Sequence, residues 1–149
     1  MKRLLPFLLI LSASAQTLPK WAGCGPSFAN PGWLGWCAMA VPAIQSQGIY
    51  SYTMYQFLPN GGKTPTVSTT TGGAIILRTW HPTIGRIDIL GLGTVGVATT
   101  STATTGAFSG GAVAVFTSKR GWTMEAGGIE NKAGASPKPQ WIAGPGLTW

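Results

Sequence analysis

The feature that most constrains this 149-residue chain is a two-residue periodicity with almost no helical pattern. Beyond residue 15, no window places apolar residues at i, i+3, i+4 and i+7 between capping residues. Short runs with apolar residues at every second position alternate instead with Gly, Pro, Asn and Ser. These runs predict strands at residues 20–29, 33–42, 49–58, 67–80, 86–98, 107–118, 122–130 and 140–149. We therefore expect an all-β chain with eight strands in one domain.

The first fifteen residues have the layout of a secretory signal peptide. Lys2 and Arg3 precede an apolar run at residues 4–11, and Ala13-Ser14-Ala15 matches an A-x-A cleavage site. A run this short does not span a bilayer as a helix, which takes about 20 residues. We expect residues 1–15 to be removed and residues 16–149 to form an exported β-domain.

The exported chain is rich in glycine and poor in charge. It keeps all 22 glycines and eight of the ten basic residues, but its only acids are Asp88, Glu125 and Glu130. Charged residues make up 9% of the whole chain, whereas soluble domains usually have about a quarter. Side chains other than charged ones must therefore face the surroundings.

The connections between the predicted strands fall into two length classes. The second, fourth and sixth, "AIQSQG", "HPTIG" and "KRG", are compact, whereas "PNGGKTP", "TTSTATTG" and "NKAGASPKP" are longer and polar. The first, "NPG", is short and departs from this alternation. Alternation of short turns and longer loops is typical of transmembrane β-barrels.

Charge is predicted to lie on one face of the sheet. A hairpin centred on Thr83 pairs Arg78 with Asp88, an opposite-charge pair on adjacent strands. Their neighbours Leu77, Ile87 and Ile89 then point to the other face. The sequence therefore indicates an apolar outer face and a charged interior.

Tryptophan gathers at the predicted strand ends. Trp33, Trp80, Trp122, Trp141 and Trp149 all lie at or next to such an end. An indole ring is apolar with one polar N–H, so it suits the boundary between lipid and water. We interpret these residues as aromatic girdles; the alternative is that they cap a water-soluble core.

The C-terminal segment "QWIAGPGLTW" carries an apolar row, because Trp141, Ala143, Leu147 and Trp149 share one parity, interrupted by Pro145. With the signal peptide, the eight amphipathic strands and the sparse charge, this row resembles the last strand of small bacterial outer-membrane β-barrel proteins. The resemblance implies an eight-stranded antiparallel up-and-down transmembrane barrel in the outer membrane of a Gram-negative envelope. It also implies that the partners are outer-membrane lipid, lipopolysaccharide and, during insertion, the barrel assembly machinery.

The interior of an eight-stranded barrel is just filled by side chains, so an open diffusion pore is not expected. Buried charges must be paired, and we assign Arg78, Arg86, Asp88 and Glu125 to a charge network in the lumen, in which an inward-facing Glu125 could pair with a residue such as Arg86. Pro26 and Pro145 lie in the first and last strands, which must pair to close the barrel, and proline removes a ladder donor. Three outcomes are open: bulges at both prolines, a weakly bonded seam, or an N-terminal third that is not strand.

The two cysteines are predicted to form a disulfide. A hairpin turning at Asn30-Pro31 places Cys24 opposite Cys37 on one face. Export favours oxidation, and closing so short a loop contributes about 3 kcal/mol in the loop-entropy model. The alternative is two reduced, buried thiols. Two thiols and His81, the only histidine, do not make a four-ligand zinc site, so no metal is expected.

Other functional classes are poorly supported. "GLGTVG" at Gly91–Gly96 matches a dinucleotide-binding pattern, but no helix signal or correctly spaced acid follows; the glycines are interpreted as room for a tightly curved wall. His81 lies in a compact turn without a nucleophile motif, so neither catalysis nor a cofactor is expected. The basic residues are dispersed, which argues against nucleic acid; those in long loops, Lys63, Lys132 and Lys138, suit lipopolysaccharide phosphates.

The expected function is structural or surface-related: envelope integrity, adhesion through the longer loops, or a scaffold for a partner. The main alternative is a secreted or periplasmic, water-soluble β-sandwich or closed barrel that acts as a binding module. An envelope enzyme would require His81 to line a cavity beside a serine or an aspartate.

Overall fold

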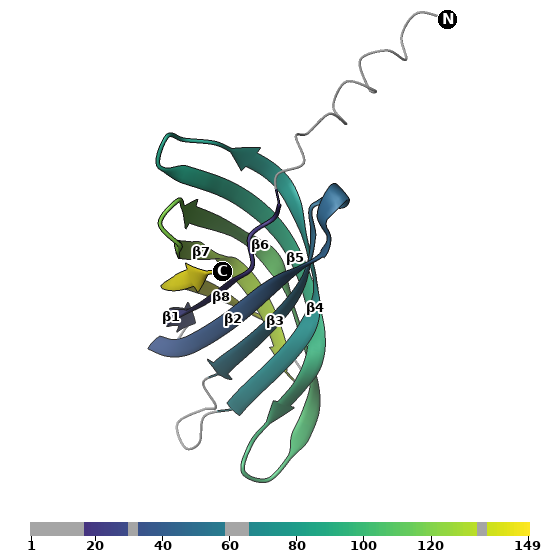
Figure 1. The fold of residues 1–149 in the computed structure, drawn as a ribbon. Coiled ribbons are helices and arrows are strands. Elements are labelled where there is room, and N and C mark those ends of the chain that lie inside the picture. Colours follow the sequence, from purple (N-terminus) through teal and green to yellow (C-terminus); the bar gives the residue numbers. More distant parts are fainter. Residues whose placement is uncertain (1–16, 30–32, 59–65, 134–136) are drawn as a thin grey trace, which may run out of the picture.

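The structure, a computed structural model, describes residues 17–29, 33–58, 66–133 and 137–149 (Figure 1). Its eight strands are β1 (Trp21–Ala29), β2 (Trp33–Ile44), β3 (Ile49–Leu58), β4 (Thr66–Trp80), β5 (Gly85–Thr99), β6 (Thr104–Ser118), β7 (Trp122–Ala133) and β8 (Pro137–Thr148). All eight predicted strands are present, and their ends differ from the predicted ones by at most three residues. The expected signal peptide lies outside the described residues.

The strands form a closed antiparallel barrel in which each strand pairs with its sequence neighbours and β1 pairs with β8. This confirms the eight-stranded up-and-down barrel and excludes the β-sandwich alternative. Within the described residues the only helical turn is Gln45–Gln47, between β2 and β3, and no helix is long and apolar enough to cross a membrane.

The two ends of the barrel differ. At one, which we call the turn end, lie the compact turns after β2, β4 and β6, the start of β1 and the end of β8 (Figure 1). At the other, the loop end, lie the connections after β1, β3, β5 and β7. The connection after β5 is shorter than the sequence suggested, because the ladder extends to the pair Thr99–Thr104 and leaves only residues 100–103 as the turn.

Alternation along each strand separates the lumen from the outer wall. In β8, Gln140, Ile142 and Gly144 are buried, whereas Trp141 and Ala143 between them are exposed. Because successive side chains of a strand point to opposite faces, one strand serves both surfaces. The lumen is filled by large side chains, of which the largest fully buried are Trp21, Trp36, Tyr50, Tyr52, Met54 and Leu90.

Glycine allows neighbouring strands to approach closely at the inner wall. A Cβ built on Gly25 would meet the carbonyl oxygen of Ala143 and lie 2.6 Å from the Cα of Gly144. A Cβ built on Gly96 would likewise overlap the backbone of β4. A Cβ built on Gly93 would have no atom within 4 Å. The steric role expected for the "GLGTVG" glycines therefore applies to Gly96 and not to Gly93, which faces outward.

The predicted pairing of Arg78 with Asp88 is wrong. Residues 67–76 do pair with residues 90–99 in the register centred on Thr83, but the register shifts by one residue between Ile76 and Arg78. Beyond this shift Asp88 pairs with Thr79, and Arg78 pairs with Ile89. β4 therefore has one extra residue at this point, which is a β-bulge. The alternation of side chains between the two faces is interrupted at a bulge, and both Leu77 and Arg78 are exposed.

The seam between β1 and β8 is interrupted at its prolines. Residues 21–23 pair with residues 146–148, and residues 27–29 pair with residues 140–142 in the same register, but the pairing is absent between these two groups. Pro26 and Pro145 lie within this interval. Of the three outcomes left open by the sequence, the structure shows a continuous β1 and a locally weakened seam without a bulge.

Candidate functional site: the outer wall and the lumen

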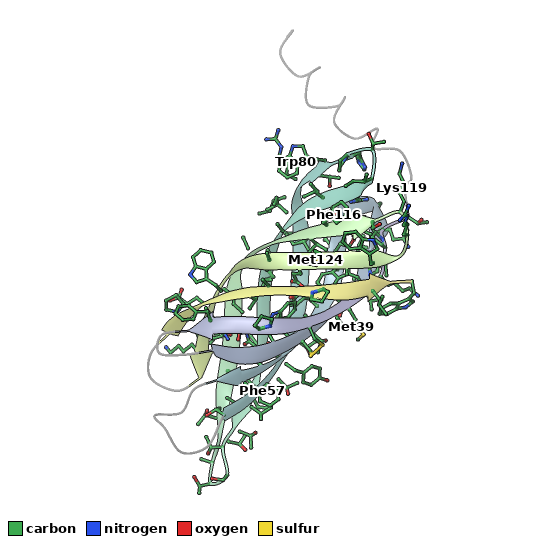
Figure 2. All side chains as sticks on the ribbon, turned by 90° about the vertical axis from the view of Figure 1, so that its left-hand side faces the viewer. Met39, Phe57, Trp80, Phe116, Lys119 and Met124 are labelled. Atoms are coloured by element: carbon green, nitrogen blue, oxygen red, sulfur yellow. A yellow bond between two sulfur atoms is a disulfide. The ribbon has the colours of Figure 1, made fainter. Side chains whose placement is uncertain are left out.

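The outer wall exposes large apolar side chains over most strands. Those exposed are Phe28, Met39, Ile44, Tyr55, Phe57, Val67, Ile75, Leu77, Trp80, Ile84, Val95, Val97, Phe108, Trp122, Met124, Trp141, Leu147 and Trp149. In Figure 2, Trp80 and Lys119 lie toward the turn end and Phe57 lies toward the loop end. A soluble monomer rarely exposes a contiguous apolar patch larger than a few hundred Å², so the number of exposed apolar side chains is unusual for a water-soluble surface.

Charged side chains on the outside are confined to the two ends in the described part of the chain. Lys20, Arg78, Lys119 and Arg120 lie near the turn end, whereas Glu130 and Lys132 lie near the loop end of β7. The middle of β7 carries Met124, Ala126 and Gly128 on the same face. The outer wall therefore has an uncharged middle band.

The tryptophans expected at the girdles are exposed where they are described. Trp80, Trp122 and Trp149 lie at the turn end, and Trp141 lies toward the loop end. The guanidinium of Arg78 lies 5.1 Å from the centre of the Trp80 ring, an outward cation–π contact. The Trp33 side chain lies outside the described residues.

Arg86 and Asp88 form an ion pair in the lumen near the turn end. The Arg86 Nε donates to Asp88 Oδ2 at 2.7 Å and to Oδ1 at 2.9 Å. Thr79 also donates to Asp88 Oδ1, and the Asp88 side chain is almost fully buried. Thr79 thus takes the place on β4 that the sequence had given to Arg78.

Glu125 does not join this pair. Its side chain is 1% exposed, and Tyr52 across the lumen donates a hydrogen bond of 2.8 Å to its Oε1. The Tyr52 ring in turn packs against Trp21 in a T-shaped arrangement, with 5.8 Å between the ring centres. The expected contact of Glu125 with Arg86 is therefore wrong, and the four-residue charge network reduces to one ion pair and one separate carboxyl group.

Uncharged amides form a second lumenal network toward the loop end. Gln140 Nε2 donates to Ser27 at 2.7 Å, and its Oε1 accepts from Gln56 at 3.1 Å and from Asn131. Ser109 donates to Asn131. The sequence pattern did not predict this network, although Gln140 has the opposite parity to the outward Trp141 and is therefore expected on the inner face.

Cys24 and Cys37 are opposite each other in the β1–β2 ladder and form a disulfide. Cys24 is exposed and Cys37 is half-buried, so the bridge lies on the outer wall and not in the lumen. It joins β2 to the strand that has the interrupted seam. The bridge therefore supports β1 on the side away from β8.

The remaining candidate residues lie at the ends. His81 is exposed in the turn after β4, away from the lumen. The ammonium of Lys132 lies 5.6 Å from the centre of the Phe108 ring at the loop end. Lys63 and the Lys138 side chain lie outside the described residues. Within the described ranges no three His, Cys, Asp or Glu side chains gather as metal ligands.

Comparison with solved structures finds similarity to the crystal structure of Ail, the attachment invasion locus protein of Yersinia pestis. The TM-score is 0.46 and 10% of the aligned residues are identical, over 88% of this chain and 95% of that chain. No family model and no curated protein sequence matches the chain.

Proposed function

We propose that this chain is an integral outer-membrane β-barrel with a closed, side-chain-filled lumen and a structural or surface-interaction role. The observation that carries the proposal is the distribution of polarity: the outer wall has an apolar, uncharged middle band, while Arg86, Asp88 and Glu125 face inward. In lipid every backbone polar group needs an internal partner, and a closed barrel supplies one.

The height of the apolar band fits a membrane. In β8 the outward row from Trp141 to Trp149 begins and ends with an aromatic residue and carries no charge. A membrane strand takes about 9–11 tilted residues, which matches this spacing. The tryptophans at its two ends would then lie at the two boundaries of the bilayer.

Fractionation tests the proposal directly. The protein is expected to pellet with outer membranes, to resist carbonate extraction, and to change its gel mobility on heating because the barrel unfolds. Recovery in the soluble periplasmic or culture fraction would instead support a water-soluble closed barrel that acts as a binding module.

Lipopolysaccharide is the proposed partner at the loop end. Lys132 lies just outside the apolar band, and Lys63 and Lys138 belong to the segments around the loops. Replacing all three by Gln is expected to increase detergent sensitivity of the cells and to weaken retention of the barrel. Unchanged sensitivity and retention would argue against this partner.

Recognition by the barrel assembly machinery is proposed from the outward row Trp141, Ala143, Leu147 and Trp149. A Trp149→Ser variant is expected to accumulate less in outer membranes, yet to refold in detergent as the unmodified protein does, because recognition and folding are separate requirements. Equal accumulation of the two proteins in cells would rule out this role for Trp149.

A further inference from the structure

Three buried oxygen atoms near the turn end of the lumen have no hydrogen-bond partner within the described part of the chain. They are Thr117 Oγ1, Thr123 Oγ1 and Glu125 Oε2. A fourth such atom, Gln56 Oε1, belongs to an amide that already donates to Gln140 in the network toward the loop end. Buried polar atoms without partners are rare in folded proteins and call for an occupant such as water or an ion.

These three atoms come from one small part of the inner wall. Thr117 on β6 and Thr123 on β7 are direct partners in the ladder, so their side chains are neighbours. Glu125 is two residues beyond Thr123 and faces the same way. One carboxylate and two hydroxyl groups thus gather on adjacent strands.

Glu125 has no basic partner among the described residues around it. Arg86 pairs with Thr117 in the β5–β6 ladder, but its guanidinium is held by Asp88. From β3, Tyr52 offers Glu125 a neutral hydroxyl, and Tyr50 is likewise neutral. The lumen therefore contains two acids and one base in the described residues, and Glu125 is the acid that has no basic partner there.

We propose that the lumen binds one small monovalent cation of the Na⁺ class between Glu125 Oε2 and the hydroxyl oxygens of Thr117 and Thr123. Oxygen atoms are the ligands that hard cations prefer, and one bound cation would balance the charge of Glu125 once its carboxyl group has lost its proton. The ion enters from the turn end, where the half-buried Thr117 and the 15% exposed side chain of Arg86 lie. It neutralises Glu125 and ties β7 to β6.

The test uses the full mature protein refolded in detergent and unfolded with urea. Unfolding is compared in NaCl and in N-methyl-D-glucamine chloride at equal ionic strength, since three side-chain oxygen atoms can surround Na⁺ but not the much larger organic cation. Above the dissociation constant, each tenfold rise in Na⁺ is expected to raise the folding equilibrium constant about tenfold, because the ion binds only the folded state.

Two variants assign the effect to the site. Glu125→Gln keeps an acceptor for Tyr52 but removes the charge, so the Na⁺ dependence is expected to disappear. Glu130→Gln removes an exposed carboxylate from the outer wall and is expected to retain the full dependence. Persistence of the dependence in Glu125→Gln, or equal stability of the unmodified protein in the two salts, would overturn the proposal.

Diffraction from crystals of the unmodified protein soaked in Tl⁺ gives a test that needs no variant. An anomalous peak within coordination distance of Glu125 Oε2 is expected, whereas density for water alone would contradict the site. This site does not depend on where the barrel resides in the cell, so a soluble barrel found by fractionation would leave it standing.

Discussion

The indole N–H of Trp36 lies inside the barrel and donates to the carbonyl oxygen of Pro26 at 3.0 Å. The same N–H lies 3.3 Å from the carbonyl oxygen of Ala143 on the opposite side of the seam. Both carbonyls belong to the interval in which β1 and β8 have no ladder pairs. Because a buried carbonyl without a donor is costly, one tryptophan from β2 stabilises the joint that closes the barrel.

Trp36→Phe is expected to lower the free energy of unfolding by about 1–3 kcal/mol, since it leaves both carbonyls without the indole donor. Amide hydrogen exchange should accelerate in β1 and β8 and stay unchanged in β4 and β5, which are far from the seam. Trp122→Phe is the matched control, because its indole is exposed on the outer wall. Uniform acceleration of amide exchange over all strands would show that Trp36 stabilises the barrel by filling the lumen and not by its hydrogen bonds at the seam.

Two glycines of opposite orientation test the close approach of the strands. Gly25→Ala is expected to prevent barrel closure or to destabilise it severely, because the new Cβ would overlap the backbone of β8 at Ala143 and Gly144. Gly93→Ala is expected to be neutral or to stabilise by about 0.4–1 kcal/mol, since its Cβ meets open space and the unfolded chain loses freedom. Heat-dependent gel mobility and urea unfolding measure both, and comparable folding of the two variants would refute the steric explanation.

Arg86 and Arg78 lie on adjacent strands, but only Arg86 belongs to the lumenal ion pair. Loss of the ion pair is therefore expected to lower stability much more than loss of the Arg78 charge. Asp88→Ala leaves the largely buried Arg86 without its partner and is expected to cost about 3–5 kcal/mol. Arg78→Gln is expected to change stability by less than about 0.5 kcal/mol, because Arg78 faces outward and contacts Trp80. Urea unfolding distinguishes these outcomes, and a large effect of Arg78→Gln would favour the register without a bulge.

The number of strands and the division into two faces could be predicted because both depend on local signals. Alternation has a period of two within each strand, and turn residues such as Pro82 and Gly121 mark the ends. The register beside the β4–β5 turn could not be predicted in this way. A bulge at Leu77 shifts the pairing by one residue, and nothing in the local alternation requires it.

The interior was harder to predict than the wall, because closure brings together residues that are distant in sequence. Gln56 and Gln140 meet across the lumen although 84 positions separate them, and Tyr52 reaches Glu125 over 73 positions. Composition suggested that inward charges would pair with one another. The sequence pattern gives the face of each residue but not the residue that it meets.

The proposed membrane position of the barrel makes a prediction that a soluble barrel does not. Ala126 faces outward midway between Trp122 and Glu130 on β7, and Ile84 is 69% exposed in the turn after β4. In phospholipid vesicles, Ala126→Arg is expected to cost about 2–4 kcal/mol, because the charge enters the middle of the bilayer, whereas Ile84→Arg at the boundary costs about 0–1 kcal/mol. On a water-exposed wall both variants would be nearly neutral. The two exposed positions differ in their expected depth in the bilayer. Equal, small effects of the two substitutions on urea unfolding in vesicles would therefore contradict the proposal that β7 faces lipid.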